Sequence, residues 1–397
     1  MSVTARSSRH AVPFWRDVRV LRILSQVVFV LALALVAGFL YANVSRALAA
    51  RGMAGGFGFL KLEAAFEIGE GIDYDPSDSY GRAFLVGLVN TLLVSAYGIV
   101  LATILGVIAG VARLSSNWLV SHIAVVYIEV MRNTPLLVQL FFWYFVAMVQ
   151  GPPIKESLTL PGPIYVSNKG IALPWAFSSP TVQPWLYCLV TGVVLAVVVF
   201  ILLRRLEKRS GPLSYPFLMA LAAFAGVVAL GWLAVTWLAG QAPLVWETPT
   251  IGRFSYEGGQ RFSPEFAALL IGLVVYTGAF IAEVVRGGIQ AVSKGQREAA
   301  RAMGLSNTQV LRLVILPQAM RVIVPPLTSQ YLNLAKNTSL AVAIGYPDLY
   351  SVAGTIYNQG GKPVPVLILI MGSYLTMSLI TSLFMNIYNR RVQFVER

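Results

Sequence analysis

The sequence predicts an all-α membrane protein with about eight transmembrane helices. Hydrophobic residues make up 57% of the 397 residues and charged residues only 12%, roughly half the charged share of an ordinary soluble domain. The mean hydropathy is +0.70. At least eight stretches approach or exceed the roughly 20 apolar residues that cross a bilayer core as a helix. A soluble globular protein is excluded, because its surface would need more ionised side chains than this chain has.

The apolar runs predict eight spans, which leave three long loops on one side of the membrane. The first span is expected to stay in the chain as a helix, because its apolar core, Ile23 to Tyr41, is longer than the roughly 7–15 residues of a signal peptide. The eight spans are expected over residues 22–42, 84–112, 118–149, 185–203, 213–239, 264–286, 318–346 and 364–388.

The positions of the basic residues predict the orientation. If the N-terminus is inside, 19 of the 30 Lys and Arg residues lie in the inner segments, and the outer loops hold most of the acidic residues. Inner loops of membrane proteins carry this excess of positive charge. Both termini are therefore expected in the cytoplasm, and the net charge of +13 is explained without a nucleic-acid partner.

The three outer loops are expected over residues 43–83, 150–184 and 240–263. The second contains seven prolines, which interrupt helices and central strands. It is expected to lie as irregular structure over the outer face.

One long inner loop predicts two short helices. Ser293 and Gln296 have capping-box spacing, so a helix should begin near Lys294 and stop at Gly304, which can take the left-handed conformation. Ser306 and Gln309 repeat the capping box. The second helix should reach Leu316, with a break or the start of the next span at Pro317. Three interpretations remain open: a helix that docks on another protein, an inert linker, and a DNA-binding helix-turn-helix, which the flanking spans disfavour.

Ionisable and polar side chains within the spans are candidates for a translocation pathway, because charged groups at membrane depth need water or a partner. Glu129 and Arg132 share one face of the third span, where they could pair with each other. Glu283 and Arg286 have the same spacing, and there an interfacial salt bridge is favoured over substrate contact. A mixture of acidic and basic groups would suit a zwitterion.

The seventh span is the most polar. Pro325 and Pro326 lack the backbone N–H groups that a continuous helix needs as donors, so non-helical backbone beside a cavity is expected there. A polar packing or subunit interface is the alternative. The pathway candidates in this span are Gln330, Asn333, Lys336, Asn337, Thr338 and Ser339.

Other chemistry has no support in the residues. His10 and His122 are far apart and Cys188 is the only cysteine, so no metal-ligand set is expected. No nucleotide-binding P-loop occurs, because Gly361-Lys362 is followed by Pro363.

Three segments resemble permeases of ATP-binding-cassette importers. EAARAMGLSNTQVLRLVILP resembles their EAA loop, with Val314 in place of isoleucine. RNTPLLVQLFFWYF resembles the RGTPLLVQ segment of the polar amino-acid group, with Asn133 replacing glycine, and AKNTSLAVAIG resembles its KxTSL stretch. The EAA-loop matches are Glu298, Ala299, Ala300, Gly304, Leu316 and Pro317.

The resemblance implies a domain organisation. A type I importer permease core would occupy residues 84–390, interrupted by an insertion at 150–262 with two extra helices. Residues 1–83 would add a cytoplasmic N-terminus, a first span and an outer loop, and 391–397 a cytoplasmic tail. The chain looks most like the larger permease subunit of a general L-amino-acid transport system.

The resemblance also implies partners and a function. The EAA helix would be the coupling helix, with Glu298 contacting a cytoplasmic ATPase, Ala299 and Ala300 permitting close approach, and Gly304 making the turn. ATP and Mg would bind the ATPase, and this chain would bind no cofactor and catalyse no reaction. A second permease, identical or related, and an extracytoplasmic solute-binding protein would complete an importer of polar L-amino acids in the bacterial inner membrane. An ion- or proton-coupled secondary transporter is the alternative.

Overall fold

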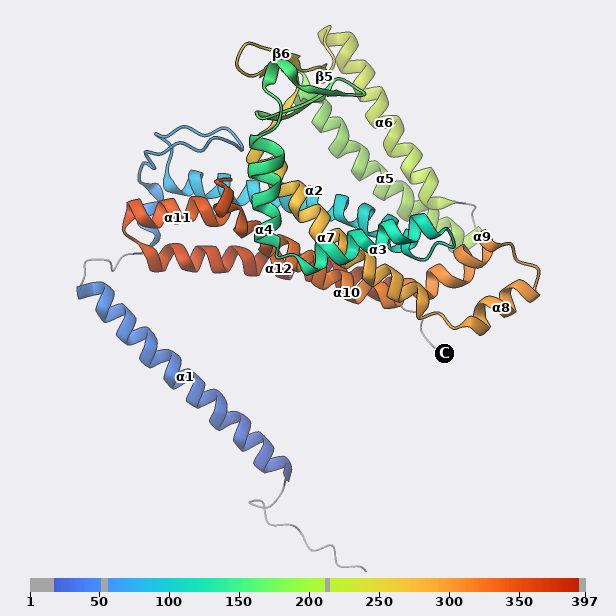
Figure 1. Ribbon diagram of the computed structural model, residues 1–397, viewed down its shortest axis with the longest axis horizontal. Helices are drawn as coiled ribbons and strands as arrows, with labels where there is room; N and C mark the ends of the chain where they lie inside the picture. The colour runs from blue at the N-terminus through green and yellow to red at the C-terminus, as the bar shows by residue number, and fades with distance from the viewer. Residues whose placement is uncertain (1–17, 51–55, 211–214, 393–397) are drawn as a thin grey trace, which may run out of the picture.

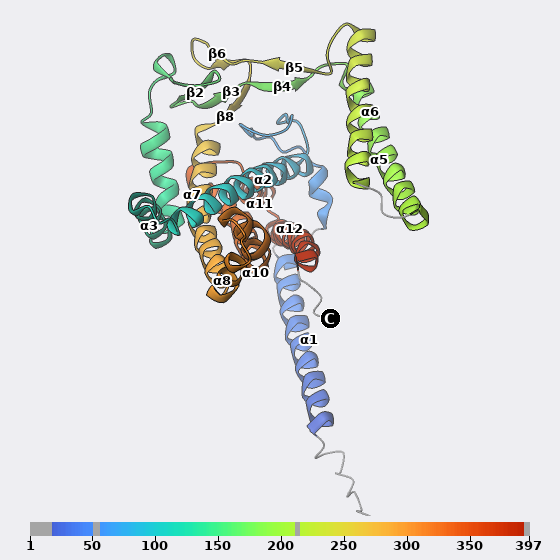
Figure 2. The ribbon, with the colours of Figure 1, turned by 90° about the vertical axis from the view of Figure 1, so that its right-hand side faces the viewer.

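The computed structural model describes residues 18–50, 56–210 and 215–392, which form a bundle of long helices with small β-sheets on one side (Figures 1 and 2). The expected N-terminal segment 1–17 and most of the tail 391–397 lie outside the described residues. The helices are α1 (Val18–Ala50), α2 (Tyr80–Arg113), α3 (Trp118–Asn133), α4 (Leu136–Phe141), α5 (Val182–Ser210), α6 (Pro216–Ala239), α7 (Pro264–Gln290), α8 (Lys294–Ala302), α9 (Asn307–Gln309), α10 (Leu316–Asn337), α11 (Leu349–Gly360) and α12 (Pro363–Val392).

Among the described residues, seven helices are long and apolar enough to cross a membrane, and a bent pair makes an eighth span. Every expected span is matched in order, so the prediction of about eight transmembrane helices is confirmed. The short helix α11 lies between the last two spans and was not expected.

The third span is not the single helix expected over 118–149. It bends by 107° between α3 and the segment Leu136–Val149. Thr134, in extended conformation, precedes Pro135, and a residue before proline is disfavoured in the helical region. Gln139 donates hydrogen bonds to the backbone oxygens of Met131 (2.9 Å) and Thr134 (3.0 Å). One buried amide therefore satisfies two carbonyls at the break.

The seventh span is also different from the expectation. Pro325 and Pro326 lie inside α10, so the backbone stays helical where an interruption was expected. The next segment, Thr338–Ile344, is a 3₁₀ helix, and the change of backbone geometry comes there. Val324 and Leu327, on either side of the two prolines, are buried within the protein, an environment in which membrane helices tolerate proline.

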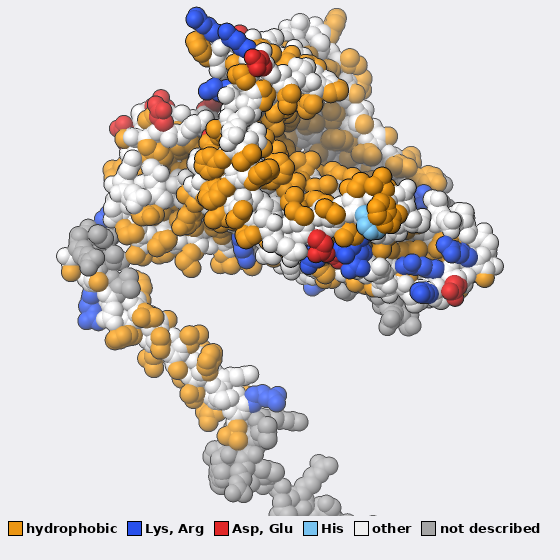
Figure 3. Space-filling view, viewed as in Figure 1, with side chains coloured by type: hydrophobic (Ala, Val, Ile, Leu, Met, Phe, Trp, Pro, Cys, Tyr) orange, Lys and Arg blue, Asp and Glu red, His pale blue; other side chains and the backbone are white. Residues whose placement is uncertain are grey.

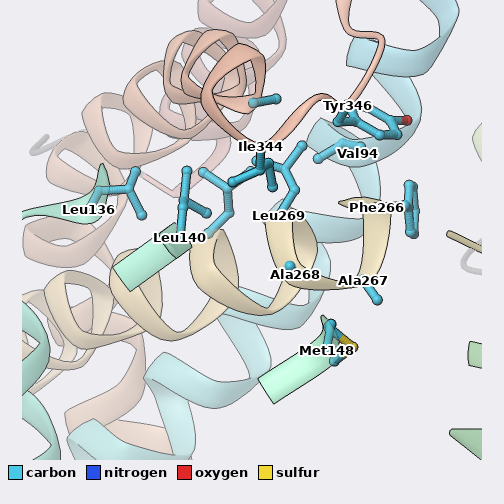
Figure 4. Packing of buried hydrophobic residues seen from close by; sticks show 12 residues of the cluster. Val94, Leu136, Leu140, Met148, Phe266, Ala267, Ala268, Leu269, Ile344 and Tyr346 are labelled. Atoms are coloured by element: carbon cyan, nitrogen blue, oxygen red, sulfur yellow. The ribbon is translucent and has the colours of Figure 1, made fainter. Parts of the chain in front are cut away.

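The helix pair α2 and α7 forms the centre of the core. A Cβ atom at Gly110 would lie 2.6 Å from the backbone oxygen of Ala282, so only glycine permits this approach of α2 to α7. Small residues are the usual means by which membrane helices pack closely. On the outer half of the core, Leu140 of α4, Leu269 of α7 and Ile344 point toward one another (Figure 4).

A buried polar network joins α2 to the start of α11. The Asn90 amide donates to the backbone oxygens of Glu70 (3.0 Å) and Pro347 (2.9 Å), and the Thr91 hydroxyl accepts from Leu349 N (2.9 Å). The Asp348 carboxylate caps α11 by accepting from Ser351 N at 2.9 Å. Burial raises the pKa of Asp348 to about 6.

The expectation of irregular structure in 150–184 is wrong, because this loop folds into strands. An antiparallel sheet has the order β1-β2-β3-β8, and two further ribbons pair β4 with β5 and β6 with β7. The prolines lie outside the strands, in the connections and at the start of α5, so they remove no ladder hydrogen bond. The strands are β1 (Leu158–Leu160), β2 (Ile164–Ser167), β3 (Gly170–Leu173), β4 (Trp175–Ser178), β5 (Leu244–Glu247), β6 (Thr250–Ile251), β7 (Tyr256–Glu257) and β8 (Gln260–Phe262).

Two helical parts stand apart from the core. The antiparallel hairpin α5–α6 is connected through the β4–β5 ribbon and stands to one side (Figure 2). Its helices pack mainly on each other, and α1 makes no extensive contact with another described element (Figure 1).

Candidate functional site

The short helix α8 ends as the glycine pattern predicted. Gly304 has a φ of +79°, its N–H donates to the Arg301 oxygen (2.9 Å), and Leu305 N–H donates to the Ala300 oxygen (3.3 Å). This pair of hydrogen bonds is the Schellman motif, which favours glycine because of the left-handed conformation.

One of the two predicted capping boxes is confirmed. Ser306 and Gln309 exchange hydrogen bonds between side chain and backbone at the start of α9. Ser293 makes no side-chain cap on α8, although the helix begins at Lys294 as expected. Arg297 instead donates to the Ile289 oxygen at 2.6 Å, so α8 is held to the end of α7.

The adjacent alanines Ala299 and Ala300 of α8 face different surroundings. Ala300 is buried in a cluster with Val310 and Ile315 of the same chain, so the close approach that it permits is internal. Glu298 and Ala299 are exposed. Figure 3 shows Lys and Arg side chains gathered at this end of the molecule.

No break occurs at Pro317. The segment from Asn307 continues through a π-helical stretch, Val310–Ile315, into α10 as one helix. Of the two outcomes expected for Pro317, the start of the next span is the one observed.

Three of the predicted pathway residues meet in one pocket. Gln330, Asn333 and Asn337 of α10 line a cavity of about 230 Å³. Tyr276, Thr277 and Phe280 of α7 form its other wall. The α7 residues were not predicted from the sequence. Tyr276 and Phe280 are one helical turn apart, and Phe280 is three residues before the charged Glu283, so the three share one helix face. That spacing was the available signal.

The remaining candidates of the seventh span lie outside this pocket. The Thr338 and Ser339 hydroxyls donate to the oxygens of Ala335 (2.9 Å) and Lys336 (2.8 Å), within their own helix. Lys336 is exposed.

The pairing of Glu129 with Arg132 that their spacing allowed is not the one observed. Glu129 is 3.9 Å from Arg113 of α2, and Arg132 is 3.8 Å from Glu283 of α7. Glu129 also accepts a hydrogen bond from Asn133, the residue that replaces the glycine of the resembling segment. The ionic partners of Glu129 and Arg132 therefore come from α2 and α7, which are adjacent to α3 in space, and not from the next turn of α3 itself.

Glu283 is the centre of this ionic cluster. Its carboxylate contacts Arg113 and Arg132, and its predicted pairing with Arg286 is confirmed at 2.8 Å. The Glu283 side chain is only 17% exposed. The Arg132 guanidinium also lies 5.3 Å from the ring centre of Phe280, which lines the α7–α10 pocket. The cluster therefore connects α2, α3 and α7 beside that pocket.

A family model and several relatives match most of this chain. The family described as "binding-protein-dependent transport system inner membrane component" matches residues 102–394. The amino-acid ABC transporter permease protein YhdX of Escherichia coli strain K12 is 46% identical over 380 residues, 94% of each chain. The general L-amino acid transport system permease protein AapQ of Rhizobium johnstonii is 44% identical, over 93% of this chain and 92% of that one. The glutamate/glutamine/aspartate/asparagine transport system permease protein BztB of Rhodobacter capsulatus is 38% identical, over 88% of each chain.

Proposed function

Because the chain belongs to the family of binding-protein-dependent transport system inner membrane components, we propose that it is the membrane-spanning subunit of an ATP-driven importer of polar L-amino acids. The relatives AapQ and BztB, named for amino-acid transport, support this substrate class. The observation that carries the proposal is α8, a short helix held at both ends with Glu298 and Ala299 exposed. Such a helix suits docking in a groove of a partner.

In the proposed complex, α8 docks on a cytoplasmic ATPase that binds ATP and Mg. Glu298 makes a polar contact with the ATPase and Ala299 permits its close approach. Ala300 packs on this chain's own helices, Gly304 ends α8, and Pro317 begins the next span. The chain itself catalyses no reaction and binds no cofactor. ATPase closure would move α8, and Arg297 would transmit that movement to α7.

The proposed pathway passes the pocket between α7 and α10. Gln330, Asn333 and Asn337 offer amide donors and acceptors to a polar solute, and the cavity of about 230 Å³ is smaller than pockets for drug-sized ligands. Glu129 and Arg132 lie at the inner end of this path. A second permease, identical or related, completes the pathway.

A solute-binding protein would deliver the amino acid on the opposite side, where the sheets and the segment 56–79 lie. Acidic side chains gather on that segment (Figure 3). The chain would lie in the bacterial inner membrane with both termini in the cytoplasm, as the excess of bases on the α8 side supports.

The test is ATP-dependent uptake by proteoliposomes that contain this chain with the ATPase and second permease that copurify with it. Glu298→Lys should abolish ATPase copurification and uptake while leaving membrane insertion unchanged. Glu257→Lys makes the same charge change on an exposed residue of β7 and should leave ATPase copurification unchanged. Wild-type uptake by the Glu298→Lys complex would contradict the docking role. Uptake driven by an ion gradient without ATP would support a secondary transporter instead.

A further inference from the structure

A second pocket lies on the outer side of the molecule, separate from the α7–α10 pocket. It occupies about 640 Å³ between the segment before α2, the outer parts of α2 and α7, and the strands around β7 and β8. The two pockets share no lining residue.

Side chains of opposite charge line this outer pocket. Glu70 supplies a carboxylate, and Lys169 and Arg261 supply basic groups. Among the described residues, no ion pair joins Glu70 to either base. Opposite charges that border one cavity without touching leave space for a ligand that carries both signs.

The backbone places Arg261 near the residue that binds Glu70. Ser263 donates a short hydrogen bond to the Glu70 carboxylate. Arg261 is two residues from Ser263 in extended chain, so both side chains face the same side, about 6.6 Å apart along the strand. Arg261 donates one hydrogen bond to the Tyr256 oxygen (3.0 Å), which leaves guanidinium donors for a carboxylate.

The surroundings of Glu70 favour a cationic ligand. Burial raises the pKa of its carboxyl, because the ionised form loses hydration. An ammonium group in the pocket would offset that loss. Tyr97, Phe262 and Phe266, in mutual ring contact, provide an apolar wall beside the charges.

We propose that this pocket is an outer binding site for an amino acid zwitterion, in which Glu70 binds the ammonium group and Arg261 with Lys169 binds the carboxylate. The site recognises the part common to all L-amino acids and leaves the variable side chain toward the aromatic wall. It would hold the solute before the solute reaches the α7–α10 pocket. The inference rests on the proposed function for its ligand class, but it concerns different residues.

The test is protection of an introduced cysteine from a membrane-impermeant maleimide. Cys188→Ser removes the native thiol, and Ser255→Cys then places one thiol in the lining of the outer pocket. The purified complex in lipid nanodiscs, without binding protein, is labelled with and without a mixture of free L-amino acids. The mixture should slow labelling at least fivefold, and the same mixture after N-acetylation, which removes the ammonium charge, should not.

Matched controls locate the protection. Phe254→Cys lies next to Ser255, is 74% exposed and does not line the pocket, so its labelling should not change. Glu70→Gln and Arg261→Gln in the Ser255→Cys chain should each remove protection, since the glutamine at 70 can still accept from Ser263. Arg253→Gln, outside the pocket lining, should retain it.

Two outcomes would overturn the outer site. One is unchanged labelling of the Ser255→Cys complex while wild-type proteoliposomes still import amino acids with ATP. The other is equal protection by N-acetylated amino acids. Asn333→Leu in the α7–α10 pocket should leave protection intact, and its loss would also contradict a separate site. Absence of ATP-driven import by the wild-type complex would instead overturn the proposed function.

Discussion

The helix pairs α2–α7 and α5–α6 are similarly apolar but differ in how much of them is buried. Over one 18-residue stretch of each helix, the mean hydropathy is 2.4 in α2 and 2.2 in α7, against 3.0 in α5 and 2.3 in α6. The buried shares of these stretches are 33% and 56% in the first pair, but 6% and 11% in the second. Hydropathy therefore measures suitability for a bilayer and does not distinguish a core helix from a peripheral one.

Small and polar side chains make the difference. In α2, Gly110 permits backbone approach to α7, Asn90 bonds to the segment before α2, and Thr91 bonds to the start of α11. Between α5 and α6, the atoms nearest to a Cβ added at Gly231 or Gly192 belong to the opposite helix of the hairpin. In lipid no hydrophobic force draws helices together, so close packing and hydrogen bonds decide which helices join the core.

The largest expected effect comes from the ionic cluster of the core. Glu283→Gln removes the carboxylate shared by three arginines, and breaking a largely buried pair in this way costs about 3–5 kcal/mol. Glu207→Gln, in the partly exposed Arg204–Glu207 pair of the hairpin, should cost less than about 1 kcal/mol. Thermal unfolding of the detergent-solubilised chain, followed by tryptophan fluorescence, measures both. Equal changes in melting temperature for Glu283→Gln and Glu207→Gln would refute this difference between the core and the hairpin.

A second effect concerns pH. The Asp348 carboxyl has a raised pKa of about 6 in the fold against 3.8 otherwise, so the fold favours its protonated form. The protonated Asp348 carboxyl therefore stabilises the fold below about pH 4. This stabilisation is lost as the pH rises through 6, which lowers the free energy of unfolding by an amount on the order of 3 kcal/mol. Asp348→Asn keeps a side-chain oxygen to cap α11 and removes the titration. The difference in melting temperature between variant and wild type should therefore shift in favour of the variant from pH 4 to pH 7. A difference in melting temperature that does not change with pH would contradict the raised pKa of Asp348.

A smaller effect is expected from glycine substitution in the two regions. Gly110→Ala places a methyl group 2.6 Å from a backbone oxygen that cannot rotate away, which should cost about 2 kcal/mol. At Gly226 of α6 nothing lies within 4 Å of the new methyl group. Gly226→Ala should be neutral or stabilise by up to about 1 kcal/mol, because alanine favours the helix. The melting temperature should fall for Gly110→Ala. For Gly226→Ala it should rise or stay unchanged.

The smallest effect should follow removal of the hairpin. Ser178 of β4 and Leu244 of β5 are paired, so residues 179–243 can be replaced by an Asn-Gly turn without moving the strands. The melting temperature of the remaining core should change by less than about 2 °C. A fall of more than about 5 °C would show that the hairpin stabilises the core.

Much of the molecule follows from local pattern. The apolar runs predicted all eight spans, and Gly304 and the Ser306–Gln309 box predicted where the short inner helices end and begin. Each of these features depends on residues within a few positions of one another, so one sequence is enough to recognise it.

Contacts between distant segments could not be predicted in this way. Glu129 and Arg132 are one turn apart and could have paired, but each has its ionic partner on another helix, Arg113 for Glu129 and Glu283 for Arg132. The proline-rich loop was expected to be irregular, but its prolines fall between strands whose partner β8 is about 90 residues further along. Ala300 was assigned to a partner surface and is buried by this chain's own helices.

The sequence by itself determined the membrane class, the spans, the distribution of charge and the capped inner helix, because bilayer thickness and helix capping act on contiguous residues. The tertiary structure alone decided which apolar helices form the core, which acid gathers three arginines, and which polar residues share a pocket. Those outcomes depend on close approach between segments far apart in the chain, and hydropathy carries no information about that approach.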